Sequence, residues 1–80
     1  MTIIYSTKAK EDLTRLDWRI RDKIITRLGK EAPKKKSIIR LSDSEFYKLD
    51  LEDHIIIGQI SENQFNILTV VRKQKIKIPQ

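Results

Sequence analysis

The side chains of this chain that could do chemistry are chiefly lysines and arginines, and many of them lie in two clusters without acids. Residues 34–41 hold four cations and no acid, a net charge of +4, and residues 72–80 do the same. Lys and Arg bind phosphates, and they stabilise a phosphoryl transition state without a cofactor. The clusters therefore predict contact with phosphates or an acidic partner; the other interpretation is solvated surface. The residues predicted to contact nucleic acid are Lys34, Lys35, Lys36, Arg40, Lys73 and Lys77.

Two single residues between the clusters could add proton transfer or phosphate binding. His54 is the only histidine, and an imidazole changes its charge near neutral pH. Strand alternation sets it with Ile56 and apart from Ile55, so it is either a proton-transfer group or a histidine at the start of a strand. Lys48 alternates with Asp50 on one face. It is therefore either a functional lysine or one half of a surface ion pair.

Most other kinds of catalytic site are disfavoured by the residue types present. One histidine and no cysteine leave too few ligands for a metal site, and no disulfide is available. Gly29 and Gly58 are the only glycines, and neither lies in a phosphate-binding loop. No serine lies in a nucleophile elbow. We expect no metal and no small-molecule cofactor.

The N-terminal half of the chain has the pattern of a short strand followed by two helices. Residues 2–5 (TIIY) predict the strand, residues 6–16 the first helix and residues 17–32 the second, which Pro33 ends. Trp18 is expected to pack over the helical hairpin. The predicted apolar stripe of the second helix is Ile20, Ile24 and Leu28, with Ile25 beside them.

The C-terminal half reads as short strands joined by turns. Residues 37–41 are a strand or an extended arm, residues 42–45 a turn, and residues 46–51, 54–60 and 65–71 the strands of a meander. The predicted fold class is α+β: a short N-terminal strand, an antiparallel helical hairpin, and a three- to four-stranded antiparallel sheet packed on the helices.

Length and composition indicate one small domain over residues 1–80. A chain of 80 residues has a thin core, which disfavours a large enclosed active site. The basic tail 73–80 is either an edge strand or a flexible arm. No apolar stretch is long enough to span a membrane, and the lack of cysteine suits a reducing compartment. We therefore expect a cytoplasmic protein that does not enter membranes.

The order of these elements resembles the RelE/ParE superfamily, the toxins of bacterial type II toxin–antitoxin systems. The resemblance rests on the helical hairpin KAKEDLTRLDWRIRDKIITRL, the dipeptide RL at 40–41, the strand FYKLDLEDHIIIGQI and the closing VVRKQK. It covers nearly the whole chain. It implies a strand, two antiparallel helices and an antiparallel sheet, in agreement with the pattern.

The resemblance also implies which residues would form an active site. Members of the RelE branch cleave mRNA in the ribosome, where the ribose 2′-hydroxyl attacks the adjacent phosphorus. Lys48 matches the family's basic strand residue, and Arg72 or Lys75 matches the basic residue after the last long strand. His54 would be the proton-transfer group, and Ile55 occupies the position of the family's strand Arg.

Two functions of different classes follow from the resemblance. The first is a metal-independent, ribosome-dependent mRNA endoribonuclease in which the catalytic residues are Lys48, His54, Arg72 and Lys75. The second is a non-catalytic binding module, either a ParE-like DNA gyrase inhibitor or a member that has lost cleavage. The expected partners are a cognate antitoxin and either the ribosome with mRNA or DNA gyrase.

Overall fold

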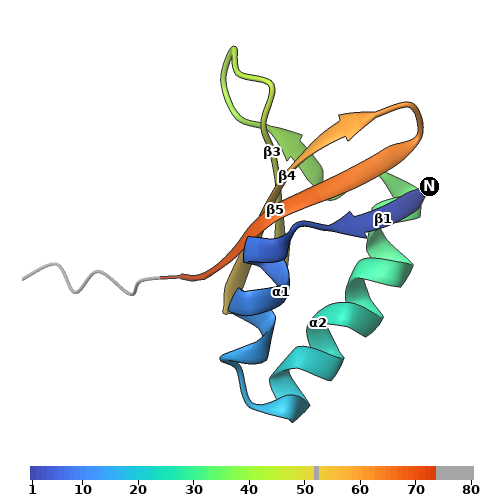
Figure 1. Ribbon diagram of the computed structural model, residues 1–80. Helices are drawn as coiled ribbons and strands as arrows, with labels where there is room; N and C mark the ends of the chain where they lie inside the picture. Colours follow the sequence, from blue (N-terminus) through green and yellow to red (C-terminus); the bar gives the residue numbers. More distant parts are fainter. Residues whose placement is uncertain (52, 74–80) are drawn as a thin grey trace, which may run out of the picture.

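The computed structural model describes residues 1–51 and 53–73 of the chain (Figure 1). The predictions for Lys75, Lys77 and the rest of the tail from residue 74 lie outside the described residues. The elements in chain order are β1 (Thr2–Tyr5), α1 (Thr7–Thr14), α2 (Trp18–Glu31), a short 3-10 helix (Ala32–Lys34), β2 (Ile38–Arg40), β3 (Tyr47–Leu51), β4 (His54–Ser61) and β5 (Gln64–Arg72).

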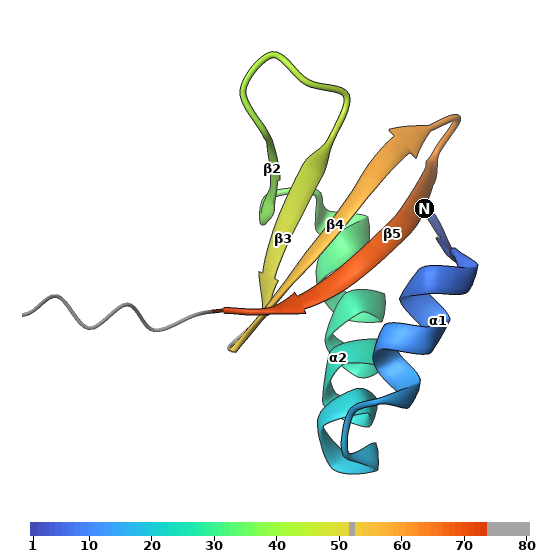
Figure 2. The ribbon, with the colours of Figure 1, turned by 60° about the vertical axis from the view of Figure 1, so that its left-hand side comes forward.

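The five strands form one sheet in the order β1-β5-β4-β3-β2. β1 runs parallel to β5, and every other neighbouring pair is antiparallel. Both helices lie on the same side of the sheet, and the opposite face carries no helix of the described chain (Figure 2). The predicted α+β class is confirmed, with the N-terminal strand joining four antiparallel strands in a single sheet.

A thin apolar core fills the space between the helices and the sheet. Its strand residues alternate, because successive side chains of a strand point to opposite faces. In β3, Leu49 and Leu51 are buried, while Asp50 between them is exposed. The buried apolar residues are Ala9, Leu13, Ile24, Leu28, Ala32, Leu49, Leu51, Ile56, Phe65, Ile67 and Val70.

The pairing of β4 with β5 shifts register at Gly58. Ile57 pairs with Thr69 and Gly58 pairs with Ile67, so β5 carries one extra residue, a β-bulge. A Cβ on Gly58 would lie 2.4 Å from the carbonyl oxygen of Asn66. The close approach of the two backbones therefore requires glycine at this position.

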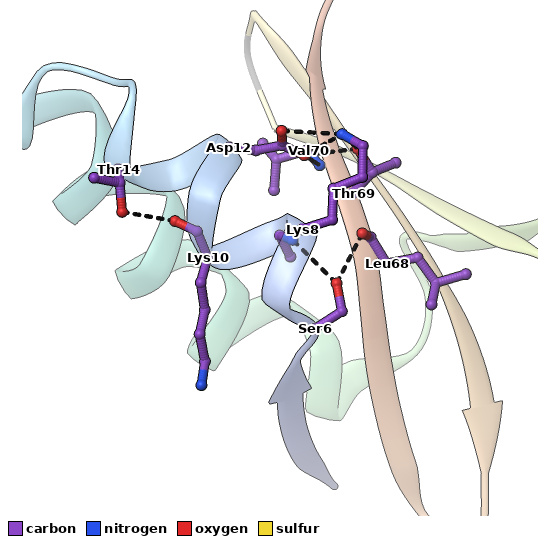
Figure 3. A network of polar contacts seen from close by, with 9 residues as sticks. Ser6, Lys8, Lys10, Asp12, Thr14, Leu68, Thr69 and Val70 are labelled. Carbon is purple, nitrogen blue, oxygen red and sulfur yellow. Dashed lines mark hydrogen bonds and ion pairs between the residues drawn. The ribbon is translucent and has the colours of Figure 1, made fainter.

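Polar side chains at the start of the helical half hydrogen-bond with β5 where β1 has ended (Figure 3). The Ser6 hydroxyl caps α1 and donates to the Leu68 carbonyl at 2.9 Å. The Asp12 carboxylate accepts from Thr69 Oγ1 at 2.7 Å and from the Val70 amide at 3.1 Å. These bonds satisfy the edge of β5 that β1 no longer pairs, and they join α1 to the sheet.

The Asp12 carboxyl is held in its charged form by this network. Burial raises its pKa, but the hydrogen bonds from Thr69, Val70 and Lys8, together with the Lys8 charge, lower it by more. The Lys8 ammonium lies 3.1 Å from Asp12 Oδ1. The pKa of Asp12 is therefore below its ordinary value, and the carboxylate stays ionised when it is folded against β5.

The prediction for the surface of α2 is wrong at three positions. Trp18 is 59% exposed and does not cover the hairpin; its ring faces the Arg19 guanidinium at 5.5 Å. Ile20 and Ile25 are also exposed. Of the predicted apolar stripe of the helix, only Ile24 and Leu28 are buried in the core. The reason is that α1 packs chiefly on β5 and contacts α2 little, which leaves the sheet to cover only a narrow face of α2.

Candidate functional site

The open face of the sheet is apolar around a small group of charges. Ile39 is 55% exposed and Val71 is 39% exposed, although both belong to strands. Ile55 and Ile57 lie half-buried between them. The cross-strand register forms two rows, one of Ile39, Lys48, Ile57 and Thr69 and the next of Asp50, Ile55 and Val71.

The charges on this face pair with one another. Lys48 Nζ lies 3.8 Å from Asp50 Oδ2, and Lys73 Nζ lies 3.9 Å from the same oxygen. Lys48 therefore forms the ion pair that its alternation with Asp50 predicts, and its functional role stays a prediction. All three side chains are partly exposed, so each pair contributes at most about 1 kcal/mol. The cluster of Lys48, Asp50 and Lys73 has a net charge of +1, which attracts an anion only weakly.

His54 lies on the other face of the sheet. It begins β4 and is 6% exposed, on the same face as Ile56, as the alternation predicts. Its Nε2 has no hydrogen-bond partner among the described residues. Lys48 pairs with Ile57, which points to the open face, so the sheet lies between the lysine ammonium and the imidazole.

Arg72 lies opposite His54 in the pairing of β4 with β5, at the exposed end of β5. Paired residues share a face, so Arg72 belongs to the helix side and Lys48 to the open side. Of the predicted catalytic residues, the structure therefore brings His54 and Arg72 together and leaves Lys48 apart from both. Lys73, the next residue, joins Lys48 through Asp50 instead.

The first basic cluster lies along the connection from α2 to β2. Lys34 ends the 3-10 helix, Lys35 has the left-handed backbone conformation with φ of 60°, and Lys36 follows, all three exposed. Arg40 is in β2, on the helix side with Tyr47, and its Nε donates to the Ser44 carbonyl at 2.9 Å. These cations line the β2 edge and are not part of the Lys48 cluster.

No group of three or more potential metal ligands occurs within residues 1–51 and 53–73. In the same part of the chain, none of the helices is long and apolar enough to cross a membrane.

Sequence reasoning missed the apolar character of the open face. The run HIIIGQI (54–60) is the most apolar of the chain, yet Ile55 and Ile57 point to the open face, which no helix of the described residues covers (Figure 2). The alternation of β3 could have indicated this. Lys48 and Asp50 are charged and point to solvent, so the residues of β4 that pair with them, Ile57 and Ile55, share that solvent-facing side. Ile39 gave no such signal.

Cleavage of RNA through its 2′-hydroxyl needs a base, an acid and positive charge around one phosphate. On the open face, the described residues offer Lys48 and Lys73 beside a carboxylate, and His54 is on the far side. An exposed apolar surface with a few charges is instead typical of a surface that binds protein. The arrangement is therefore better suited to binding than to proton transfer.

Comparison with solved structures identifies the fold. The chain is similar to the toxin–antitoxin complex RelBE2 of Mycobacterium tuberculosis, with 19% identity, a TM-score of 0.72 and coverage of 90% of this chain and 96% of that one. It is similar to the isolated E. coli RelE toxin, with 13% identity, a TM-score of 0.76 and coverage of 95% and 87%. It is also similar to a chromosomal ParDE system of P. aeruginosa, with 13% identity, a TM-score of 0.76 and coverage of 92% of this chain and 97% of that one.

The chain therefore has the fold of the RelE and ParE toxins, as the resemblance implied. No protein-family model matches the chain, and no curated protein matches it at a significant level. At these identities the likeness establishes the fold alone, and function must be argued from the residues on it.

Proposed function

We propose that this protein is the toxin of a toxin–antitoxin pair and that it arrests growth by binding a protein, with DNA gyrase the first candidate. The fold supports the toxin part, because its structural neighbours include RelE, solved alone and with its antitoxin, and a ParDE system. By the same likeness we propose a cognate antitoxin as its partner and the cytoplasm as its place of action.

The open face is the observation that carries the binding mode. Ile39 is 55% exposed and Val71 is 39% exposed, and Ile55 and Ile57 extend the same apolar area. Each apolar Å² removed from water contributes about 25 cal/mol, so a partner that covers these side chains gains substantially. RNA offers few apolar groups to such a surface, whereas a protein offers many.

The endoribonuclease alternative is supported less well by the placement of its residues. Lys48 and Arg72 face opposite sides of the sheet, and so do Lys48 and His54. Ile55 occupies the position where the resemblance expects an arginine, beside Asp50 in register. A scissile phosphate on the open face would therefore meet two lysines, a carboxylate and an isoleucine.

A matched pair of variants tests this proposal. Ile57→Lys places a charge in the open face, and Ile25→Lys places one on the exposed surface of α2, where Ile25 is 44% exposed. Induced in bacteria, the Ile57 variant should lose growth arrest and the inhibition of gyrase supercoiling, and the Ile25 variant should keep both. Thermal unfolding confirms that both variants fold.

Two results would refute the proposal. If Ile57→Lys arrests growth as strongly as the parent chain, the open face is not the binding surface. If the parent chain causes no arrest at all, the toxin role itself fails. Copurification with the product of a small adjacent reading frame tests the antitoxin separately.

A further inference from the structure

The charge of this chain is divided between its helical half and its sheet half. Residues 1–36 hold eleven lysines and arginines against five acids, a net charge of +6, whereas residues 37–71 hold two against six, a net charge of −4. Both α1 and α2 belong to the first range, and both lie on the side of the sheet opposite to the open face (Figure 2). The side of the molecule that carries the helices is therefore strongly cationic.

The outer side of α2 arranges part of this charge in a row. Arg19, Lys23, Thr26 and Lys30 follow one another at spacings of four, three and four residues, which places them along one side of the helix. All four residues are exposed. At a rise of about 1.5 Å per residue, the row is about 16 Å long. These four residues, which we call the α2 stripe, therefore present three cations and a hydroxyl to solvent, with no acid among them.

The lysines of the α2 stripe have no carboxylate partner in the described part of the chain. Within residues 1–51 and 53–73, neither Lys23 nor Lys30 forms an ion pair. The Arg19 guanidinium lies 5.5 Å from the centre of the Trp18 ring. A guanidinium that stacks on a ring can still donate to a phosphate from its edge. A phosphate that approaches the stripe therefore competes with no acid of the described chain for the two lysines.

The residue types of the α2 stripe favour phosphates over a protein, and a duplex over a single strand. The stripe has no apolar residue, and lysine is depleted at protein–protein interfaces. A single strand binds by stacking its bases on aromatic side chains, whereas Trp18, the one aromatic residue of α2, faces Arg19. A duplex presents its phosphates in rows and can be bound through them alone. A row of cations without aromatic residues therefore suits a duplex.

We propose that the α2 stripe binds the phosphate backbone of double-stranded DNA, without regard to base sequence. The α2 stripe and the open face lie on opposite sides of the sheet, so one molecule can hold DNA and a protein at once (Figure 2). The choice of DNA over RNA rests on the proposed function, because DNA gyrase works on a DNA duplex. The stripe thereby gives the toxin a contact with the DNA that its protein target holds.

The salt dependence of DNA binding measures how many phosphates the chain contacts. The full chain is titrated into a short fluorescent DNA duplex, and the affinity is obtained from anisotropy at several salt concentrations. The logarithm of the affinity falls with the logarithm of the salt concentration, with a slope of about −0.9 per phosphate contact. Lys30→Gln should make this slope shallower by about 0.9, and Lys23→Gln together with Lys30→Gln by about 1.8. Between about 50 and 200 mM salt, the double variant should therefore lose about twelvefold less affinity than the parent chain.

Arg21→Gln is the matched control, because it removes the same charge from the same helix at a half-buried position outside the stripe. It should leave the slope unchanged, and thermal unfolding confirms that each variant folds. Equal slopes for the parent chain and the double variant, or an equal change in Arg21→Gln, would overturn the stripe as the site. An RNA duplex that binds as tightly overturns the choice of DNA, and polyglutamate that binds as tightly overturns the choice of nucleic acid. The assay contains neither gyrase nor cells, so its failure is distinct from a failure of the growth-arrest test.

Discussion

Asp12→Asn tests whether the α1–β5 network holds the scaffold together. The carboxylate accepts from Thr69 Oγ1 at 2.7 Å and from the Val70 amide at 3.1 Å, and Lys8 Nζ lies 3.1 Å away. Both bonds to β5 end on Asp12 Oδ2, so an asparagine can keep both with its amide oxygen, but they lose the negative charge and the amide nitrogen faces the Lys8 ammonium. A hydrogen bond to a charged group is about twice as strong as a neutral one, so weakening both bonds costs roughly 1.5–3 kcal/mol in total, and Lys8 adds at most about 1 kcal/mol because it is exposed.

The pH dependence follows from the lowered pKa of Asp12. A carboxyl whose folded pKa lies below its unfolded value stabilises the fold above the unfolded pKa, and that stabilisation is lost as pH falls through the folded pKa. The ordinary value is 3.8. The parent chain should therefore exceed Asp12→Asn in unfolding free energy by a constant amount at neutral pH, and the gap should shrink below about pH 4.

Urea unfolding followed by far-UV circular dichroism measures this gap, since the exposed Trp18 is a poor fluorescent reporter of the core. Asp22→Asn is the matched control, because Asp22 is an exposed aspartate of α2. It should change the free energy of unfolding by less than about 0.5 kcal/mol. A gap for Asp12→Asn that is equally small at pH 7, or that persists undiminished at pH 3, refutes the reasoning.

Three further changes have expected outcomes in the same unfolding assay. Gly58→Ala should destabilise the chain by about 1–3 kcal/mol, because its Cβ would clash with the Asn66 carbonyl oxygen; a loss below about 0.5 kcal/mol would show that the bulge relaxes. His54→Phe should stabilise it by about 1 kcal/mol, because it removes a buried nitrogen without a partner, and His54→Gln should not. Replacing Glu62 and Asn63, with φ of 49° and 61°, by Asn-Gly should add about 1 kcal/mol, because that pair suits a two-residue turn with positive φ; no gain would contradict the assigned turn.

The sequence was sufficient to predict the order and type of the elements. Ser6 and Asp17 cap the two helices as their residue types indicate, and the alternation of Tyr47–Leu51 places Leu49 and Leu51 in the core. The turn at Ser61–Gln64 also lies between the predicted strands 54–60 and 65–71. These features depend on neighbours close in the chain, which a local pattern can report.

What the sequence could not indicate depends on contacts between distant segments. The bulge at Gly58 changes the phase of β5, so that Val70 is buried although strict alternation from Ile67 would expose it. The exposure of Trp18 and Ile25 depends on how little α1 and α2 contact each other. The separation of Lys48 from Arg72 depends on the register of three strands.

The most direct test of the central claim is to map transcript ends while the chain is induced in growing bacteria. The claim is that this toxin fold binds a protein through its open face and does not cleave RNA. It predicts growth arrest with intact transcripts, and arrest that persists in Lys48→Ala, since a single partly exposed lysine contributes little to an apolar surface. Cuts in phase with codons that disappear in Lys48→Ala would contradict it.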